Sequence, residues 1–169
     1  MTTLQPNKNL TAVCGLFCPA CTFYIGSTAD PDRLKRLAER LQKTVEEIEC
    51  HGCRSDKVTF YCRTCKMVRC AAEKGLDFCG QCADYPCADL KEFQAARPHR
   101  LELWAAQARI QAAGYESWFT EMVEHYACPH CHTINSAYDL ACWHCGTSPG
   151  SAYVARHKEK ILAYLAGQK

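Results

Sequence analysis

Residues 128–146 read CPHCHTINSAYDLACWHCG. This stretch holds two Cys-x-x-Cys knuckles, Cys128/Cys131 and Cys142/Cys145, with ten residues between them. Two-residue spacing lets both sulfurs of one turn reach a single tetrahedral ion, and four thiolates complete the shell of a structural zinc site. The pattern is that of a zinc ribbon, with zinc as the expected occupant, although iron fits the same geometry. Gly146, directly after the second knuckle, permits the positive φ that such turns often need.

Histidines and aromatic residues surround these ligands. Because four cysteines complete the shell, we expect His130, His132 and His144 to face solvent rather than to bind the ion or relay a proton. A closed shell leaves no position for a substrate, so the ribbon is expected to be structural or to be a docking surface. The candidate docking positions are the ribbon and the aromatic residues Trp143, Tyr138 and Tyr126, although most such aromatic residues are expected to serve in packing.

Cysteine is abundant along the whole chain, at 15 of 169 residues, which lies near the threshold of about 8–10% that marks a cysteine-built fold. The remaining knuckles are Cys18/Cys21, Cys50/Cys53, Cys62/Cys65 and Cys79/Cys82. Four knuckles would make two four-cysteine sites, and spacing alone does not choose among the three ways of pairing them. Each filled site would contribute on the order of 10–16 kcal/mol of apparent folding free energy.

Three cysteines, Cys14, Cys70 and Cys87, stand outside the knuckles. They are buried structural thiols, since free cysteine often acts as a small core hydrophobe, or they replace knuckle members in the real sites. In a third interpretation they gather, with His51 as a fourth partner, into a more reactive site. Only this third arrangement implies chemistry.

Two enzyme-like patterns carry little weight. The spacing Cys14-x3-Cys18-x2-Cys21 is that by which radical S-adenosylmethionine enzymes hold a four-iron cluster, but no βαβ succession follows and the chain is short for their barrel. A thioredoxin-type redox pair at Cys18/Cys21 would likewise need a βαβ setting. The chain has no Ser-His-Asp set, phosphate loop or dinucleotide fingerprint. No catalytic or cofactor-binding residue is predicted, and the sequence favours a non-enzyme.

Composition and charge limit the cellular compartment and the classes of partner that we expect. The N-terminus lacks the basic and apolar regions of a secretory signal, and no segment approaches the roughly 20 apolar residues that span a bilayer. We expect a soluble cytoplasmic protein, in which thiols stay reduced unless a metal takes them. The net charge of +2 is well mixed, unlike the basic face of a nucleic-acid binder. Of the partner classes considered, another protein is the one that these features do not exclude. The oligomeric state is not predicted.

The segments between the knuckles are expected to be mostly helical. Asp30 is a favourable N-cap and Pro31 a favourable first residue for a helix over 31–41. Thr44 and Glu47 form a capping-box pattern for one further turn. A brief strand is expected over residues 57–61.

Four further helical stretches are also expected, at residues 69–74, 86–96, 99–126 and 153–165. Gly75 would end the first as a C′ residue, and Gly114 would break the third into a helical hairpin. Residues 1–13 are expected to be a polar lead-in.

The N-terminal motifs together resemble a bacterial and archaeal family, the domain of unknown function 3795, in order and spacing over about residues 12–95. The motifs that carry the likeness are Cys14-Gly15-Leu16-Phe17-Cys18 (the family's CGLYC motif) with Cys21, Cys50-x-Gly52-Cys53-Arg54, Cys65-x4-Cys70-Ala71, Glu73-Lys74-Gly75, Phe78-Cys79-Gly80-x-Cys82 and Tyr85-Pro86-Cys87. Residues 100–118 and the appended ribbon are similar to longer members.

The resemblance implies a cysteine-rich protein similar to zinc-binding proteins, without an established activity. Its occurrence in anaerobes keeps iron–sulfur occupancy open. It also implies that Cys14, Cys70 and Cys87 match motif positions, which favours metal ligation over incidental core packing.

The sequence therefore predicts a mainly α, cysteine-rich, metal-stapled helical domain with an embedded C-terminal zinc ribbon and little β. Four segments are expected: a metal-binding domain at 12–97, a helical body at 98–126, the ribbon at 127–147 and a closing helix at 148–169. All fifteen cysteines are candidate ligands for two or three zinc ions. The leading hypothesis is a zinc-binding protein with mainly structural metals and a macromolecule-docking surface. The alternative is an iron–sulfur, redox or metal-handling protein that uses the N-terminal cysteines.

Overall fold

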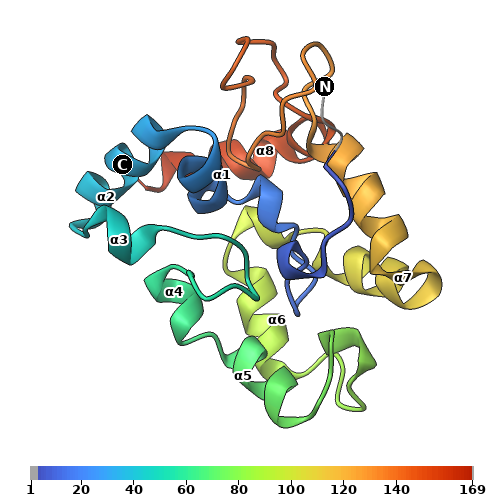
Figure 1. Ribbon diagram of the computed structural model, residues 1–169. Helices are drawn as coiled ribbons and strands as arrows, with labels where there is room; N and C mark the ends of the chain where they lie inside the picture. Colours follow the sequence, from blue (N-terminus) through green and yellow to red (C-terminus); the bar gives the residue numbers. More distant parts are fainter. Residues whose placement is uncertain (1–3, 169) are drawn as a thin grey trace.

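Helices dominate the computed structural model, which describes residues 4–168 (Figure 1). The α-helices are α1 (Thr22–Thr28), α2 (Pro31–Leu41), α3 (Val45–Ile48), α4 (Phe60–Arg63), α5 (Lys66–Glu73), α6 (Ala88–Ala95), α7 (Leu103–Tyr126) and α8 (Ala152–Ala166). Short 3₁₀ turns are η1 (Lys8–Leu10), η2 (Cys18–Ala20), η3 (Cys79–Gln81) and η4 (Pro98–Arg100). Strand pairing among the described residues is limited to isolated bridges, Thr11 with Phe17 and Ala127 with Ile134. The mainly α prediction is confirmed.

Local capping signals place α2 and α3 as the sequence predicts. The Asp30 side chain accepts a hydrogen bond from the Arg33 amide at 2.9 Å, directly before Pro31. Thr44 and Glu47 form a reciprocal capping box, with each side chain accepting from the other's backbone amide. These caps satisfy amides that have no partner within the helix.

The strand expected at residues 57–61 is wrong. Residues 57–59 are irregular, and α4 begins at Phe60 because the Cys62 and Arg63 amides donate to the Thr59 carbonyl at 2.9 and 3.1 Å. A lone extended segment has no neighbour to take its backbone hydrogen bonds, whereas a helical turn satisfies its own. Helix α5 also begins earlier than expected, at Lys66, and ends before Gly75, whose φ is 65°.

Helix α7 folds back on itself at Gly114, as the predicted hairpin requires. Gly114 has φ 81° and ψ 158°, which is outside helical geometry. Arg109 and Glu121 form an ion pair across the bend at 2.5 Å. In a straight helix these residues would be about 18 Å apart along the axis. Figure 1 shows the two limbs of α7 in yellow and orange.

The main core is aromatic and lies between the N-terminal segment, α7 and α8. The Phe17 ring packs edge-on against Phe119 at 5.0 Å, and Tyr126 stacks on Tyr153 at 4.9 Å. Such pairs add to the burial of large apolar areas.

The polar lead-in expected at residues 1–13 is wrong for residues 10–13, which are all buried. That segment is part of the core, where Thr11 pairs with Phe17 across a bridge; residues 1–3 lie outside the described residues.

A smaller second core belongs to the α1–α3 unit, defined as residues 22–49. Its buried residues are Leu34, Leu37, Ala38 and Ile48. Helices α1 and α2 pack against each other, and the unit forms the blue-to-cyan lobe of Figure 1. The chain enters this unit directly after Cys21 and leaves it directly before Cys50.

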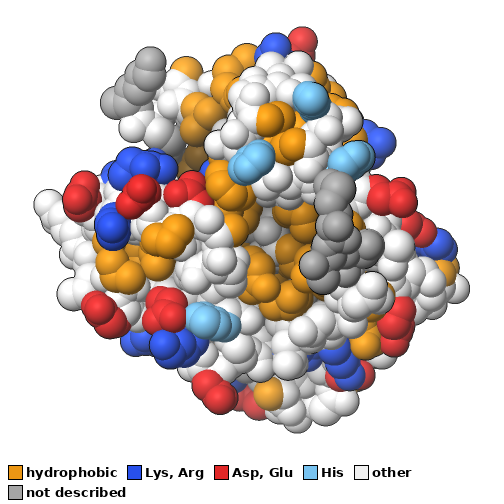
Figure 2. Space-filling model, turned by 45° about the horizontal axis from the view of Figure 1, so that its top comes forward, with side chains coloured by type: hydrophobic (Ala, Val, Ile, Leu, Met, Phe, Trp, Pro, Cys, Tyr) orange, Lys and Arg blue, Asp and Glu red, His pale blue; other side chains and the backbone are white. Residues whose placement is uncertain are grey.

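The surface in Figure 2 mixes acidic and basic side chains around a hollow lined by hydrophobic ones. This face shows no broad basic area. Among the described residues no helix combines the length and the hydropathy needed to cross a membrane.

Candidate metal centres

The four C-terminal thiols converge on one point. The sulfurs of Cys128, Cys131, Cys142 and Cys145 all lie within 4.8 Å of one another. Cys128 and Cys145 are 3.6 Å apart, as are Cys131 and Cys142. A zinc–sulfur bond of about 2.3 Å gives a tetrahedral edge of about 3.8 Å, whereas a disulfide would need about 2.05 Å. The set fits one tetrahedral ion.

The two knuckles share one backbone conformation. The Cys128 amide donates to the Thr133 carbonyl at 2.9 Å, and the Cys142 amide donates to that of Thr147 at 2.8 Å. In each knuckle the residue after the second cysteine has a positive φ, 59° at His132 and 77° at Gly146. The glycine expectation is confirmed, and His132 takes the equivalent place in the first knuckle.

The threonines were not anticipated, although both knuckles read Cys-x-His-Cys-x-Thr. The Thr133 hydroxyl lies 3.4 Å from the Cys131 sulfur and lowers the pKa of that thiol to about 5. The Thr147 hydroxyl, 3.2 Å from the Cys145 sulfur, also lowers the pKa of its thiol. Burial instead raises the pKa of Cys142 to about 11. The second cysteine of each knuckle is therefore prepared for the thiolate form that binds metal.

Asn135 is a second residue that the sequence did not single out. It is buried, and its side-chain amide donates to the carbonyls of Thr133 and Gly150 at 2.8 and 3.0 Å. Its side-chain oxygen accepts from the Trp143 amide at 3.1 Å. Asn135 thereby ties both knuckles to the end of the C-terminal module, defined as residues 127–150.

The histidine and aromatic residues near this module are either exposed or packed within the chain. His130, His132 and His144 are exposed, as expected. The aromatic residues named as docking candidates pack within the chain, which is the role expected for most such residues. Tyr126 stacks on Tyr153, Tyr138 bonds His99 at 2.6 Å, and the Trp143 indole donates to the Ile134 carbonyl at 2.9 Å.

The eleven N-terminal cysteines are placed differently. Among the described residues, the C-terminal four are the one group of three or more candidate ligands whose ligand atoms lie within 4.8 Å of one another. Three N-terminal knuckles nonetheless share one tight turn, in which the second cysteine's amide donates to the first cysteine's carbonyl. These turns are Cys18/Cys21 at 2.9 Å, Cys62/Cys65 at 3.2 Å and Cys79/Cys82 at 3.1 Å.

Burial and repulsion between neighbouring thiolates raise the pKa values of several N-terminal cysteines. Burial, followed by the charges of neighbouring cysteines, raises the pKa of Cys21 and of Cys53 to about 12 and that of Cys79 to about 11. The pKa of Cys14 and of Cys18 is also raised, chiefly by burial. Ionising several such thiols together requires a cation.

The three single cysteines differ in exposure. Cys14 is buried, and the neighbouring Val13 carbonyl accepts from the Cys79 amide at 2.8 Å. Cys70 and Cys87 are exposed. His51, proposed to join them, is exposed and bonds Glu49 at 2.8 Å.

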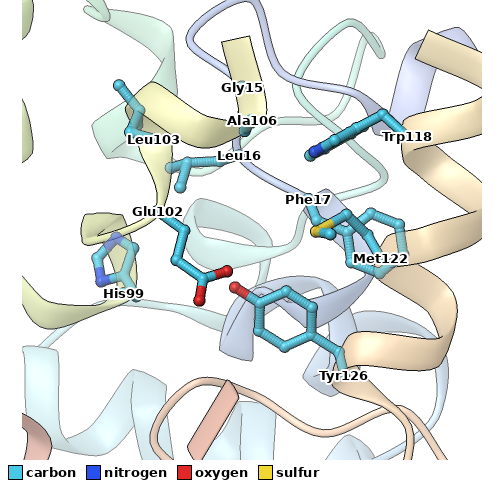
Figure 3. Close-up of a pocket in the computed structure, with 10 residues that line it drawn as sticks. All are labelled: Gly15, Leu16, Phe17, His99, Glu102, Leu103, Ala106, Trp118, Met122 and Tyr126. Carbon is cyan, nitrogen blue, oxygen red and sulfur yellow. The ribbon is translucent and has the colours of Figure 1, made fainter. Parts of the chain in front are cut away.

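A small pocket lies apart from the cysteines, between η4, α7 and the loop of Gly15 (Figure 3). Its volume is about 20 Å³, which is room for one water molecule. The Trp118 indole N–H, buried with no partner among the described residues, lines it. In Figure 3 the Glu102 carboxylate and the Tyr126 hydroxyl face one another across it. The pocket is too small for a substrate.

Comparison with protein-family models gives one match, over residues 10–92, to the family described as Protein of unknown function (DUF3795). Residues 10–92 of the chain belong to this family. The DUF3795 region contains all eleven N-terminal cysteines and none of the C-terminal four, so the family likeness and the convergent site occupy separate parts of the chain. The family resemblance seen over about residues 12–95 is confirmed, whereas the likeness of residues 100–118 and of the ribbon to longer members stays a prediction. Neither the curated proteins nor the solved structures provided a match.

Proposed function

We propose that this DUF3795 protein binds metal, and that zinc held by the C-terminal thiols builds residues 127–147 as a zinc ribbon. The observation that carries the proposal is the convergence of four sulfurs within 4.8 Å. Four thiolates in a tetrahedron are a characteristic zinc shell, and four protein ligands leave no position for a substrate. The ion would therefore be structural.

The role of this ion would extend beyond its own loop. Asp139, between the knuckles, forms an ion pair with the buried Arg33 of α2 at 3.1 Å. The same guanidinium lies 5.6 Å from the centre of the Trp143 ring. By fixing residues 128–145, the ion would hold Asp139 and Trp143 in place for Arg33. This supports a structural role that connects the C-terminal module to the α1–α3 unit.

A macromolecular partner stays a prediction. The aromatic residues first considered for docking are engaged in packing, as described above. A docking surface on the module would therefore use its exposed residues, among them His130 and His144.

A second candidate function concerns the N-terminal cysteines. Eleven thiols lie in one region, and several are buried and repel one another when charged. Thiolates bind both zinc and iron–sulfur clusters. The sulfurs of the N-terminal cysteines are more widely spaced than those of the C-terminal site. The sulfurs around an iron–sulfur cluster surround several atoms rather than one. This spacing therefore favours the alternative of an iron–sulfur or metal-handling centre in the N-terminal region.

Elemental analysis and a visible spectrum of anaerobically purified protein test both candidates. We expect Cys142→Ser to lose one equivalent of zinc relative to wild type, while His144→Ala, which changes an exposed neighbour of the ligands, loses none. Retention of all zinc by Cys142→Ser would refute the C-terminal site. A colourless protein containing only zinc excludes the iron–sulfur alternative, and a brown, oxygen-sensitive protein excludes the all-zinc one.

A further inference from the structure

The first knuckle of the chain stands at the entrance of the α1–α3 unit. Cys18 opens the turn η2 and is 8% exposed, and Cys21 is the residue from which α1 begins. The Cys21 amide donates to the Cys18 carbonyl at 2.9 Å. This turn fixes the backbone of both cysteines before any metal binds.

The second knuckle stands at the exit of the same unit. The Cys50 amide donates at 2.9 Å to the Ser27 hydroxyl, which belongs to the last turn of α1. Gly52 has φ 116°, and a Cβ there would lie 2.6 Å from the Asn9 carbonyl oxygen. Only glycine suits both this conformation and this approach. The knuckle is thus held on one side by α1 and on the other by the N-terminal segment.

These two anchors bring the knuckles together. The Cys53 amide donates to the Cys18 sulfur at 3.4 Å. The sulfurs of Cys50 and Cys53 lie within electrostatic range of Cys18, and that of Cys50 also lies within range of Cys21.

Of the two remaining knuckles, Cys79/Cys82 has other neighbours, whereas Cys62/Cys65 also lies near the first two knuckles. Cys79 lies within electrostatic range of Cys87, Cys70 and Cys65. Cys62 lies within electrostatic range of Cys21, Cys50 and Cys53. Its knuckle partner Cys65 lies within range of Cys53, Cys14 and Cys79. Because Cys62/Cys65 adjoins both groups, the pairing rests on the hydrogen bond from the Cys53 amide to the Cys18 sulfur, which joins the first two knuckles directly.

We propose that Cys18, Cys21, Cys50 and Cys53 hold one metal centre, which closes the base of the α1–α3 unit. The four thiolates would bind either a single zinc ion or an iron–sulfur cluster. The centre ties the two ends of residues 22–49, a unit with its own small core. A single zinc ion requires the cysteine side chains to rotate inward, since these sulfurs are more widely spaced than the C-terminal set. This assignment deepens the proposed metal-binding function by choosing one of the three knuckle pairings.

Anomalous diffraction from crystals of the as-purified, full-length wild-type protein, measured at the zinc and iron edges, tests the assignment. We expect a centre bonded to all four of these sulfurs; the zinc edge identifies a single ion and the iron edge a cluster. A centre that joins Cys18 and Cys21 to Cys62 or Cys65 overturns the pairing, as does a filled C-terminal site with no metal here. Metal here but none at Cys128–Cys145 overturns the zinc-ribbon proposal and supports this one.

Metal content of variants provides a second measurement. We expect Cys18→Ser, Cys50→Ser and the double variant each to lose the same single centre, because both residues serve one site and their effects are not additive. His51→Ala is the matched control, since His51 lies inside the second knuckle but is exposed and bonded to Glu49. It is expected to keep the full content. A double variant that loses two centres overturns the pairing, and if the variants do not fold, the diffraction result decides.

Discussion

At the scale of single residues, His99 is held neutral by its neighbours. The Arg100 Nε–H donates to His99 Nε2 at 3.1 Å, and His99 Nδ1 lies 2.6 Å from the Tyr138 hydroxyl. Arginine can only donate, so Nε2 is the acceptor and Nδ1 carries the proton. Burial, with help from the charges of Arg100 and Arg97, lowers the pKa of His99 to about 3.

This neutral histidine predicts a loss of stability in mild acid. The unfolded chain protonates His99 below about pH 6.5, whereas the folded chain does not until about pH 3. Its contribution is therefore present above pH 6.5 and declines as the pH falls toward 3. We expect wild type to lose about 2 kcal/mol more unfolding free energy than His99→Gln between pH 7 and pH 5, measured by urea unfolding. Equal losses in the two proteins would contradict this origin.

At the scale of elements, Glu102 joins both ends of α7 to α8. Its carboxylate lies 2.8 Å from His125 Nε2 near the end of α7, and it bonds His157 and Arg156 of α8 at 2.8 and 3.0 Å. Burial alone would raise the pKa of this carboxyl, but the hydrogen bonds from the two histidines outweigh burial and lower it to about 2. The group stays charged across the physiological range.

Removing this junction should loosen α8 from α7. We expect Glu102→Ala to lower the unfolding free energy by about 2 kcal/mol, a value reduced for the partial exposure of the site. The control is Glu73→Ala, which removes an exposed ion pair with Arg69 of 3.9 Å and should cost under about 0.5 kcal/mol. Urea unfolding of both variants at pH 7 measures the difference. Equal costs would show that Glu102 is not a junction.

Elements with local signals were predictable, and those that depend on distant neighbours were not. Asp30 and the Thr44/Glu47 pair mark helix starts through contacts within three residues. The false strand at 57–61 failed because a strand needs a partner elsewhere, and none forms there among the described residues. The repeated Cys-x-His-Cys-x-Thr is also a local signal, because it places a threonine two residues after the second cysteine of each C-terminal knuckle.

At the scale of the whole molecule, the same division applies to the metal centres. The C-terminal ligand set could be predicted because its knuckles are close in sequence and each completes the other. Partners among the eleven N-terminal thiols could not, since residues 22–49 fold separately between the first two knuckles. The Arg33–Asp139 ion pair, which joins residues 106 positions apart, left no sequence signal at all.

The placement of the C-terminal module predicts how the chain opens when that module loses its metal. The amides of Cys142 and Gly146 are held by contacts within residues 142–147, and Asn135 holds the rest of the module. We expect Cys142→Ser to lose hydrogen-exchange protection over residues 127–150, while the α1–α3 unit and α7 keep theirs because each has its own buried core residues. Ala141→Ser, an exposed neighbour, should leave protection unchanged. If Cys142→Ser instead opens the whole chain together, the module and the body form one cooperative unit, and the metal stabilises the entire fold.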